Sequence, residues 1–256
     1  MNNKLTQLFQ HKNKNLLNVY CTAGFPKKES TTEVLFALQN NGVDMIEIGM
    51  PYSDPIADGP VIQQSNMTAI ENGMTIQFLF EQLNSVKDSI TVPLIMMGYL
   101  NPVMQYGLEK FCEDAASAGI SGIILPDLPM YEYEEVFAPV FKKNNLSFIF
   151  LITPQTSEER IKKADKLSSG FLYAVSSSST TGNNLNTEDK TTYFERIAAM
   201  DLKNPLMIGF GINNKATFDT ACTYAAGAII GTAYIKALSE NNYIKESTTN
   251  FLLSIK

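Results

Sequence analysis

Eight short runs of apolar, often β-branched residues recur along the chain and alternate with longer amphipathic stretches. Because nearly every position of a run is apolar, each run is typical of a strand that is buried on both faces of a parallel sheet. Gly42 and Gly119 follow two of the amphipathic stretches, where a left-handed helix C-cap favours glycine. The expected strands are Leu17–Cys21, Met45–Gly49, Leu94–Met97, Gly122–Leu125, Phe148–Ile152, Phe171–Val175, Leu206–Gly209 and Ala228–Gly231.

The alternation of strands and helices predicts the fold class. Eight strands, each followed by at least one helix, predict an α/β protein with one (β/α)8 barrel domain over residues 1–256, an N-terminal helix and extra helices after the second and eighth strands. A length of 256 residues is typical of one such barrel. An open doubly wound sheet is the alternative for the same alternation. The helical stretches are Thr31–Asn41, Leu108–Ala118, Tyr133–Asn144, Ser157–Leu167 and Asn214–Ala225.

Charge, hydropathy and the counts of cysteine and histidine limit the partners, the cellular location and the metal sites that we expect for the chain. A net charge of −6 argues against a nucleic-acid partner. The N-terminal residues lack the apolar core of a secretory signal, and no run of roughly eighteen apolar residues occurs, so we expect a cytoplasmic protein without a membrane span. Three scattered cysteines, Cys21, Cys112 and Cys222, fit a reducing compartment. His11 is the only histidine, so no metal site is expected, although an all-carboxylate magnesium site remains an alternative.

Glycine-rich turns after the last two expected strands predict a phosphate site. Gly211 follows the seventh strand, and Gly231 and Thr232 follow the eighth. In a barrel of this kind the loops after strands 7 and 8 commonly hold phosphate through backbone N–H groups and helix N-termini. Gly182, in a long loop at 176–187 after the sixth strand, is a further candidate donor, and that loop and the loop at 51–60 are expected to act as lids.

Acidic residues in and after the expected strands, at the same end of the barrel as the phosphate site, predict acid–base chemistry. Glu47 lies inside the apolar run Met45–Gly49, and side-chain alternation places it opposite to its isoleucine neighbours, toward the barrel interior. A buried carboxyl has a raised pKa and can both donate and accept a proton near neutrality. Asp58 is the best further candidate, whereas Asp54 and Asp127 are as well explained as turn caps. A structural ion pair is the alternative role for Glu47.

The remaining candidates concern the substrate. No lysine lies at an inward position of a strand end, which disfavours a Schiff-base aldolase. With metal and Schiff-base chemistry disfavoured, the sequence favours acid–base chemistry by carboxylates on a phosphorylated, partly apolar substrate. Its apolar part is expected to lie among Tyr20, Met97, Tyr173 and Phe210, although aromatic residues of this kind are also common in a core.

The segment from Ile46 to Pro60, which reads IEIGMPYSDPIADGP, resembles the signature of the tryptophan synthase α subunit family. The resemblance spans nearly the whole chain. The match over Ile46 to Pro60 is highly specific to this family, whereas the glycine turns are shared with other phosphate-binding barrels. The supporting matches are Thr22-Ala23-Gly24-Phe25-Pro26, Met97-Gly98-Tyr99-Leu100-Asn101-Pro102, Pro126-Asp127-Leu128-Pro129, Thr181-Gly182 and Gly209-Phe210-Gly211-Ile212.

The resemblance implies a lyase that splits indole-3-glycerol phosphate into indole and glyceraldehyde 3-phosphate in L-tryptophan biosynthesis. It implies that Glu47 moves protons to the ring carbon that bears the glycerol chain. Asp58 would accept the indole N–H, and Tyr173 would lie beside Glu47. The implied substrate-binding residues are Tyr20, Met97, Thr181, Gly182, Phe210, Gly211, Gly231 and Thr232.

The resemblance also implies a partner, the β subunit of tryptophan synthase, in an α2β2 assembly. Pyridoxal phosphate would belong to that subunit, and no cofactor would belong to this chain. The implied contact residues are Pro51, Asp54, Asn101 and Pro102.

The chain departs from the family pattern in the loop after the sixth strand. It has a run of serines from Ser176 to Ser179 before Thr180-Thr181-Gly182, where many members have an Arg and a Gly-Val. Two alternative functions remain at this point: another phosphate-binding barrel isomerase, and a non-catalytic subunit that binds ligand and activates a partner.

Overall fold

All strand pairs are parallel in the computed structural model, which describes residues 2–175, 187–209, 211–240 and 243–256. The strands follow the order β5-β4-β3-β2-β1-β9-β8-β7-β6. Their bounds are β1 Leu16–Thr22, β2 Met45–Gly49, β3 Leu94–Met97, β4 Ile120–Ile124, β5 Ser147–Phe148, β6 Leu151–Ile152, β7 Leu172–Val175, β8 Leu206–Gly209 and β9 Gly227–Ile230.

The barrel closes through one segment, residues 147–152, whose two halves pair with different neighbours. β5 pairs with β4, and the N–H of Ile149 donates to the carbonyl of Ile123 at 3.0 Å. β6 pairs with β7, and the carbonyl of Phe150 accepts from the N–H of Tyr173 at 3.0 Å. The predicted fifth strand is therefore two short strands. The (β/α)8 barrel is confirmed, and the open sheet is wrong.

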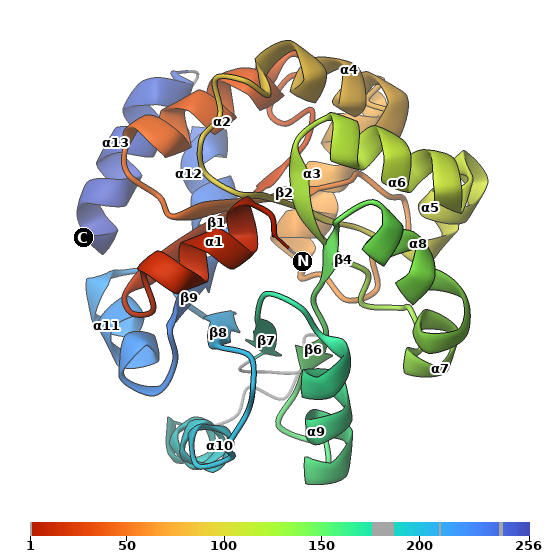
Figure 1. The fold of residues 1–256 in the computed structure, drawn as a ribbon. Helices are drawn as coiled ribbons and strands as arrows, with labels where there is room; N and C mark the ends of the chain where they lie inside the picture. The colour runs from red at the N-terminus through yellow and green to blue at the C-terminus, as the bar shows by residue number, and fades with distance from the viewer. Residues whose placement is uncertain (1, 176–186, 210, 241–242) are drawn as a thin grey trace.

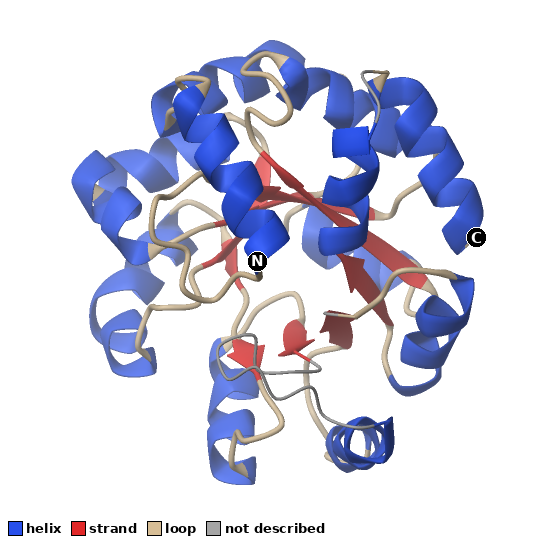
Figure 2. Ribbon diagram, turned by 180° about the vertical axis from the view of Figure 1, so that it is seen from behind, coloured by secondary structure: helices blue, strands red, loops and turns tan. Residues whose placement is uncertain are grey.

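Helices surround the strands as an outer layer (Figures 1 and 2). The predicted N-terminal helix and the extra helices after the second and eighth strands are present, and a further helix, α5, follows β3. No helix of the described residues is long and apolar enough to cross a membrane. The helices are α1 Lys4–His11, α2 Ser30–Asn40, α3 Pro60–Glu71, α4 Ile76–Val86, α5 Leu100–Tyr106, α6 Leu108–Ser117, α7 Met130–Glu132, η1 Tyr133–Phe137, α8 Ala138–Lys143, α9 Glu158–Leu167, α10 Thr187–Ala198, α11 Lys215–Tyr224, α12 Thr232–Glu240 and α13 Ile244–Ile255.

The stretch predicted as one helix over Tyr133–Asn144 is divided. A π-helical turn, η1, precedes α8, and the N–H of Ala138 donates to the carbonyl of Tyr133 across that wider turn. Pro139 comes directly afterwards and has no N–H to continue the hydrogen-bond ladder. The amphipathic pattern therefore predicted a helical stretch but not the change in helical register.

α1 covers the amino-terminal ends of the strands, at the end of the barrel away from the predicted site. Leu5 is fully buried and lies against Gly122 and Gly170. The side-chain amide of Asn3 donates to the carbonyl of Ser121 at 2.9 Å and to Ser147 Oγ at 3.1 Å. With one end of the barrel covered in this way, the carboxyl ends of the strands are left for a binding site.

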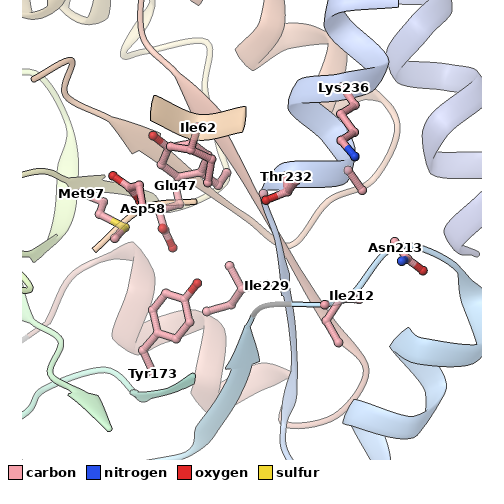
Figure 3. Close-up of a pocket in the computed structure, with 14 residues that line it drawn as sticks. Glu47, Asp58, Ile62, Met97, Tyr173, Ile212, Asn213, Ile229, Thr232 and Lys236 are labelled. Atoms are coloured by element: carbon pink, nitrogen blue, oxygen red, sulfur yellow. The ribbon is translucent and has the colours of Figure 1, made fainter. Parts of the chain in front are cut away.

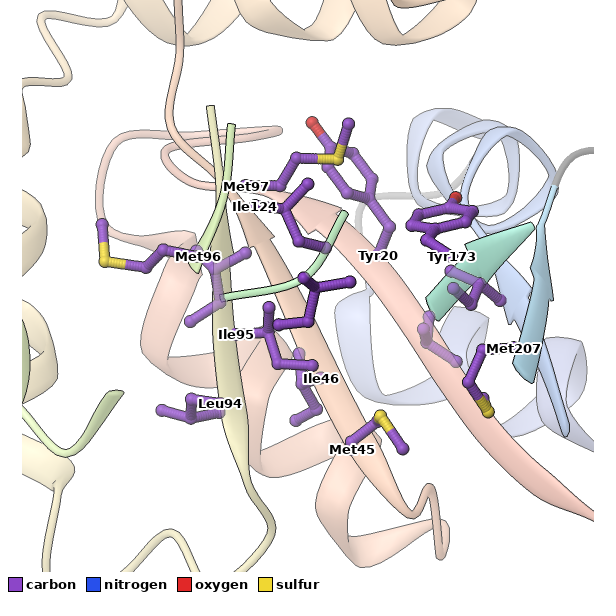
Figure 4. Packing of buried hydrophobic residues seen from close by; sticks show 14 of the residues in the cluster. Tyr20, Met45, Ile46, Leu94, Ile95, Met96, Met97, Ile124, Tyr173 and Met207 are labelled. Carbon is purple, nitrogen blue, oxygen red and sulfur yellow. The ribbon is translucent and has the colours of Figure 1, made fainter. Parts of the chain in front are cut away.

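Side-chain alternation fills the interior in layers. Tyr20 of β1 is paired in register with Glu47 of β2, and Glu47 with Ile95 of β3, so these three side chains share the inward face. Figure 4 shows Tyr20, Met97 and Tyr173 at one end of the packed interior and Met45 at the other. The Glu47 carboxyl of the predicted site is thus held by a rigid, tightly packed scaffold.

Candidate active site

A cavity of about 270 Å³ opens at the carboxyl ends of the strands. Figure 3 shows Glu47, Asp58 and Met97 on one side of it and Thr232, Asn213 and Lys236 on the other. Every predicted catalytic or substrate-binding residue that the structure describes lines this cavity. The lining residues are Tyr20, Glu47, Asp58, Ile62, Met97, Tyr173, Gly211, Ile212, Asn213, Ile229, Gly231, Thr232, Ala233 and Lys236.

Glu47 is a buried acid in the wall of the cavity. Only 1% of its surface is exposed, while Ile46 and Ile48, fully buried, occupy the opposite face of β2. Burial raises the pKa of Glu47 from 4.5 to about 8; a hydrogen bond from Asn18 opposes this rise, and the nearby Asp58 carboxyl adds to it. Glu47 therefore carries its proton at neutral pH, as a general acid requires.

Asp58 comes from the loop after β2, just before the Gly59-Pro60 start of α3. The hydroxyl of Tyr99 donates to Asp58 Oδ2 at 2.9 Å and accepts from the N–H of Ala57 at 3.0 Å. Burial raises the pKa of Asp58 from 3.8 to about 6, and the hydrogen bond from Tyr99 opposes the rise. At neutral pH Asp58 is mostly ionised while Glu47 is protonated, so the two carboxyls hold different charge states.

Two tyrosines face the carboxyls across small residues. A side chain at Gly49 would collide with the ring of Tyr20, and one at Gly209 would collide with the ring of Tyr173. Burial, followed by the charge of Glu47, raises the pKa of Tyr173 well above its usual value, so it stays a neutral hydroxyl. The two glycines thus make room for rings that shape the apolar part of the cavity.

The opposite end of the cavity has the features of an anion site. Gly211 follows β8 with φ of 79°, a left-handed conformation that favours glycine. Gly231 and Thr232 join β9 to α12, whose N-terminal N–H groups carry partial positive charge. Lys236, one turn later on α12, was missed in the sequence, although its spacing of four residues from Thr232 places both on one helix face.

The sequence also missed five other lining residues, four of which are apolar. Their signal was weak, because branched residues near strand ends read as ordinary core. Asp127, by contrast, has a structural role: both its carboxylate oxygens accept from the N–H of Leu100 at 3.0 Å, at the start of α5. The further missed residues are Ile62, Ile212, Asn213, Ile229 and Ala233.

The predicted partner residues lie together on the surface beside the cavity. Asp54 and Asn101 are exposed, and Pro51 and Pro102 are half-buried. They belong to the loop after β2 and to α5, which meet where the side-chain amide of Asn101 donates to the hydroxyl of Tyr52 at 3.5 Å. The predicted residues Thr181, Gly182 and Phe210 lie outside the described residues.

Metal ligands are not assembled in the part of the chain that the structure describes. Within those residues no group of three or more His, Cys, Asp or Glu side chains is placed to hold a metal ion. The polar groups that the cavity offers are two carboxyls, two tyrosine hydroxyls and an anion site.

Comparisons with known proteins agree with this geometry. The family described as "Tryptophan synthase alpha chain" matches residues 6–254. The tryptophan synthase alpha chain of Flavobacterium psychrophilum is 51% identical over 240 residues, which are 93% of this chain and 94% of that relative. That of Parabacteroides distasonis is 46% identical over 99% of both chains.

Solved structures give the same result. The crystal structure of the tryptophan synthase alpha chain from Legionella pneumophila subsp. pneumophila is 31% identical, with a TM-score of 0.88 over 100% of this chain and 96% of that one. A crystal structure of tryptophan synthase from M. tuberculosis, in an aminoacrylate-bound form, matches with a TM-score of 0.85 at 28% identity over 100% of both chains. Family match, sequence identity and fold together place this chain in the tryptophan synthase alpha chain family.

Proposed function

We propose that this protein, as one barrel domain, is the α subunit of a tryptophan synthase and cleaves indole-3-glycerol phosphate to indole and glyceraldehyde 3-phosphate. The observation that carries the proposal is a buried acid, Glu47, with a pKa of about 8, which faces an apolar cavity with an anion site at its far end. The family of the chain supports the same reaction.

The cavity suits the two ends of this substrate. The indole ring lies among Tyr20, Met97 and Ile229, which supply apolar and aromatic surface. The phosphate binds at the opposite end, where backbone N–H groups at Gly231 and Thr232 and the N-terminus of α12 favour an anion. Lys236 adds a positive charge at that end, which offsets the net charge of −6 of the chain. Thr181, Gly182, Phe210 and Gly211 complete the proposed substrate site.

Glu47 performs both proton transfers of the cleavage. It donates its proton to the ring carbon that bears the glycerol chain, which leaves positive charge on the ring nitrogen. The ionised Glu47 then accepts the proton of the hydroxyl on the attached carbon. The carbon–carbon bond breaks, its electron pair returns to the ring, and indole and an aldehyde form. Glu47 ends protonated, as it began.

Asp58 stabilises the charged ring during this sequence. As a carboxylate it accepts the indole N–H and so opposes the positive charge that protonation places on the nitrogen. Tyr99 holds Asp58 in place through its hydroxyl. Tyr173 stays neutral beside Glu47 and fills the space around the reacting carbon.

The partner of the chain is the β subunit, in an α2β2 assembly, which binds pyridoxal phosphate and consumes the indole. No cofactor belongs to this chain. The surface formed by Pro51, Asp54, Asn101 and Pro102 supports that contact, because it adjoins the loop that carries Asp58. The protein is located in the cytoplasm, a reducing compartment that suits its three free cysteines.

Incubation of the purified chain with indole-3-glycerol phosphate tests the function. We expect indole to appear with the chain alone and to appear faster when a β subunit is added. A control without the chain should give none. Formation of indole in neither arm would contradict the proposal and favour a non-catalytic binding subunit.

The pH dependence of kcat/KM tests the division of labour between the carboxyls. We expect a bell with its acid limb near pH 6, where Asp58 becomes protonated, and its alkaline limb near pH 8, where Glu47 loses the proton it must donate. Tyr20, Cys21 and Tyr173 also interact electrostatically with Glu47, but burial raises their pKa values so that they stay protonated. A rate that stays constant from about pH 7 to about pH 10 would show that Glu47 is not the acid.

A further inference from the structure

A carboxamide lies inside the barrel, directly beneath the proposed acid. Asn18 of β1 is fully buried, while Leu17 and Val19, next to it, are ordinary apolar residues of the opposite face. Alternation along β1 puts Asn18 on the same inward face as Tyr20. A buried amide in an apolar interior is costly unless it is hydrogen-bonded, so its partners show what it is for.

The side chain of Asn18 is directed at Glu47. Its Nδ2 donates to Glu47 Oε2 at 3.1 Å. Its Oδ1 has no hydrogen-bond partner among the described residues. The NH2 group of the amide is therefore hydrogen-bonded to Glu47, and its oxygen is not hydrogen-bonded to any described residue. Glu47 is the group that must lose and regain a proton.

We propose that Asn18 is a positioning residue that keeps Glu47 hydrogen-bonded in both of its protonation states, by turning one end or the other of its amide toward the carboxyl. The proposal deepens the proposed function and rests on the proton-transfer role of Glu47.

The chemistry of the two groups explains the exchange. An ionised carboxyl only accepts hydrogen bonds, and the Nδ2 of Asn18 donates to it. A protonated carboxyl has an O–H that needs an acceptor, and Oδ1 supplies one after the amide turns about its Cβ–Cγ bond. The NH2 group and the oxygen are nearly the same size, so the turn needs no repacking. Glu47 thus keeps its orientation through a full catalytic cycle.

The groups around Glu47 give Asn18 a second effect. Tyr20 and Cys21 of β1, Asp58 of the loop before α3, and Tyr173 of β7 all interact electrostatically with Glu47. Burial and Asp58 raise the pKa of Glu47, whereas Asn18 alone among the interacting described residues lowers it. The hydrogen bond that Nδ2 donates to the ionised carboxyl is charge-assisted, so it is stronger than the one that Oδ1 accepts from the protonated form. Without Asn18 the acid would therefore hold its proton more tightly and release it less readily.

Titration of the Glu47 carboxyl in the full-length protein tests the proposal without reference to activity. With 13C-labelled glutamate, the Glu47 NMR signal is identified as the one that Glu47→Gln removes. In Asn18→Val, whose β-branched side chain suits a buried strand, we expect the titration midpoint to rise by about one pH unit, a tenfold gain in proton affinity. Ser121→Ala, a buried polar site on β4 away from the cavity, should leave the midpoint unchanged.

Lyase kinetics distinguish the inference from the function on which it rests. In Asn18→Val we expect the alkaline limb of kcat/KM to move with the midpoint, and kcat to fall with little change in KM. If the midpoint moves and the limb does not, the catalytic role of Glu47 is wrong and the Asn18–Glu47 contact stands. An unchanged midpoint in a folded Asn18→Val variant would overturn the inference.

Asn18→Asp is the second variant, nearly identical in shape to the native residue. Its carboxyl oxygen accepts from protonated Glu47 but repels the ionised form through which the reaction passes, so we expect the midpoint to rise and kcat to fall. An unchanged midpoint in this variant would mean that the side chain at position 18 only fills space, and a lower midpoint would mean that a like charge there favours ionised Glu47. Either result would contradict the proposal.

Discussion

Glu47→Gln is expected to fold normally and to lose nearly all cleavage of indole-3-glycerol phosphate. Glutamine matches glutamate in shape but has no proton to give to the ring carbon. A single positioned acid or base contributes roughly 10²–10⁴-fold, or about 3–5 kcal/mol of the activation barrier. Initial rates of indole release at saturating substrate measure the loss. A folded variant that retains more than about a tenth of the native rate would remove Glu47 from the mechanism.

The same variant is expected to be more stable than the native protein at alkaline pH. Folding raises the pKa of Glu47 to about 8 from 4.5. Between these values the unfolded chain has lost the proton that the folded protein keeps, so native stability falls as pH rises through this window. Glu47→Gln lacks that loss, and its advantage should grow up to about pH 8 and reach a few kcal/mol, since one unit of pKa shift corresponds to about 1.4 kcal/mol.

Thermal unfolding of both proteins at pH 5 and at pH 9 measures this difference. The control is Glu33→Gln, an exposed position on α2, which should change neither activity nor the pH dependence of unfolding. If Glu47→Gln were no more stable than the native protein at about pH 9, burial would not be what raises the pKa of this acid.

The barrel was predictable because its strands are buried on both faces. The run Met45–Gly49 is apolar except at Glu47, and such a run predicts both the strand and the one side chain that stands out. The division of Phe148–Ile152 into β5 and β6 was not predictable. Nothing in that run differs between its halves; only the hydrogen-bond partner changes, from β4 to β7, and pairing is a property of the closed barrel.

The site was predictable in part, for a related reason. A charge inside an apolar run pointed to Glu47, and the same signal existed for Asn18, a polar residue within Leu17–Cys21 that was read only as part of a strand. Lys236 gave no such signal, because a lysine on a helix is usually solvated. Its place beside the cavity follows from how α12 leaves β9, which a local pattern does not contain.

Gly231→Leu is expected to raise KM for indole-3-glycerol phosphate by about ten- to a hundredfold while the barrel stays folded. A Cβ at Gly231 would meet Ile62 Cδ1 at 3.4 Å and Tyr20 Cβ at 3.5 Å, which are ordinary contacts, so the backbone tolerates a side chain. A leucine would reach into the proposed phosphate site and keep the dianion from the backbone N–H groups. Loss of hydrogen bonds to a charged group costs about 1.5–3 kcal/mol each.

A graded series separates this blockade from a general disturbance. Gly231→Ala adds only the Cβ, so its KM should rise far less than that of Gly231→Leu, while kcat should change less than KM in both because the phosphate lies away from the reacting carbon. Inhibition by glycerol phosphate, which carries the anion without the ring, should weaken in parallel with KM. A leucine variant that folds and binds glycerol phosphate as the native protein does would show that the anion site lies elsewhere in the cavity.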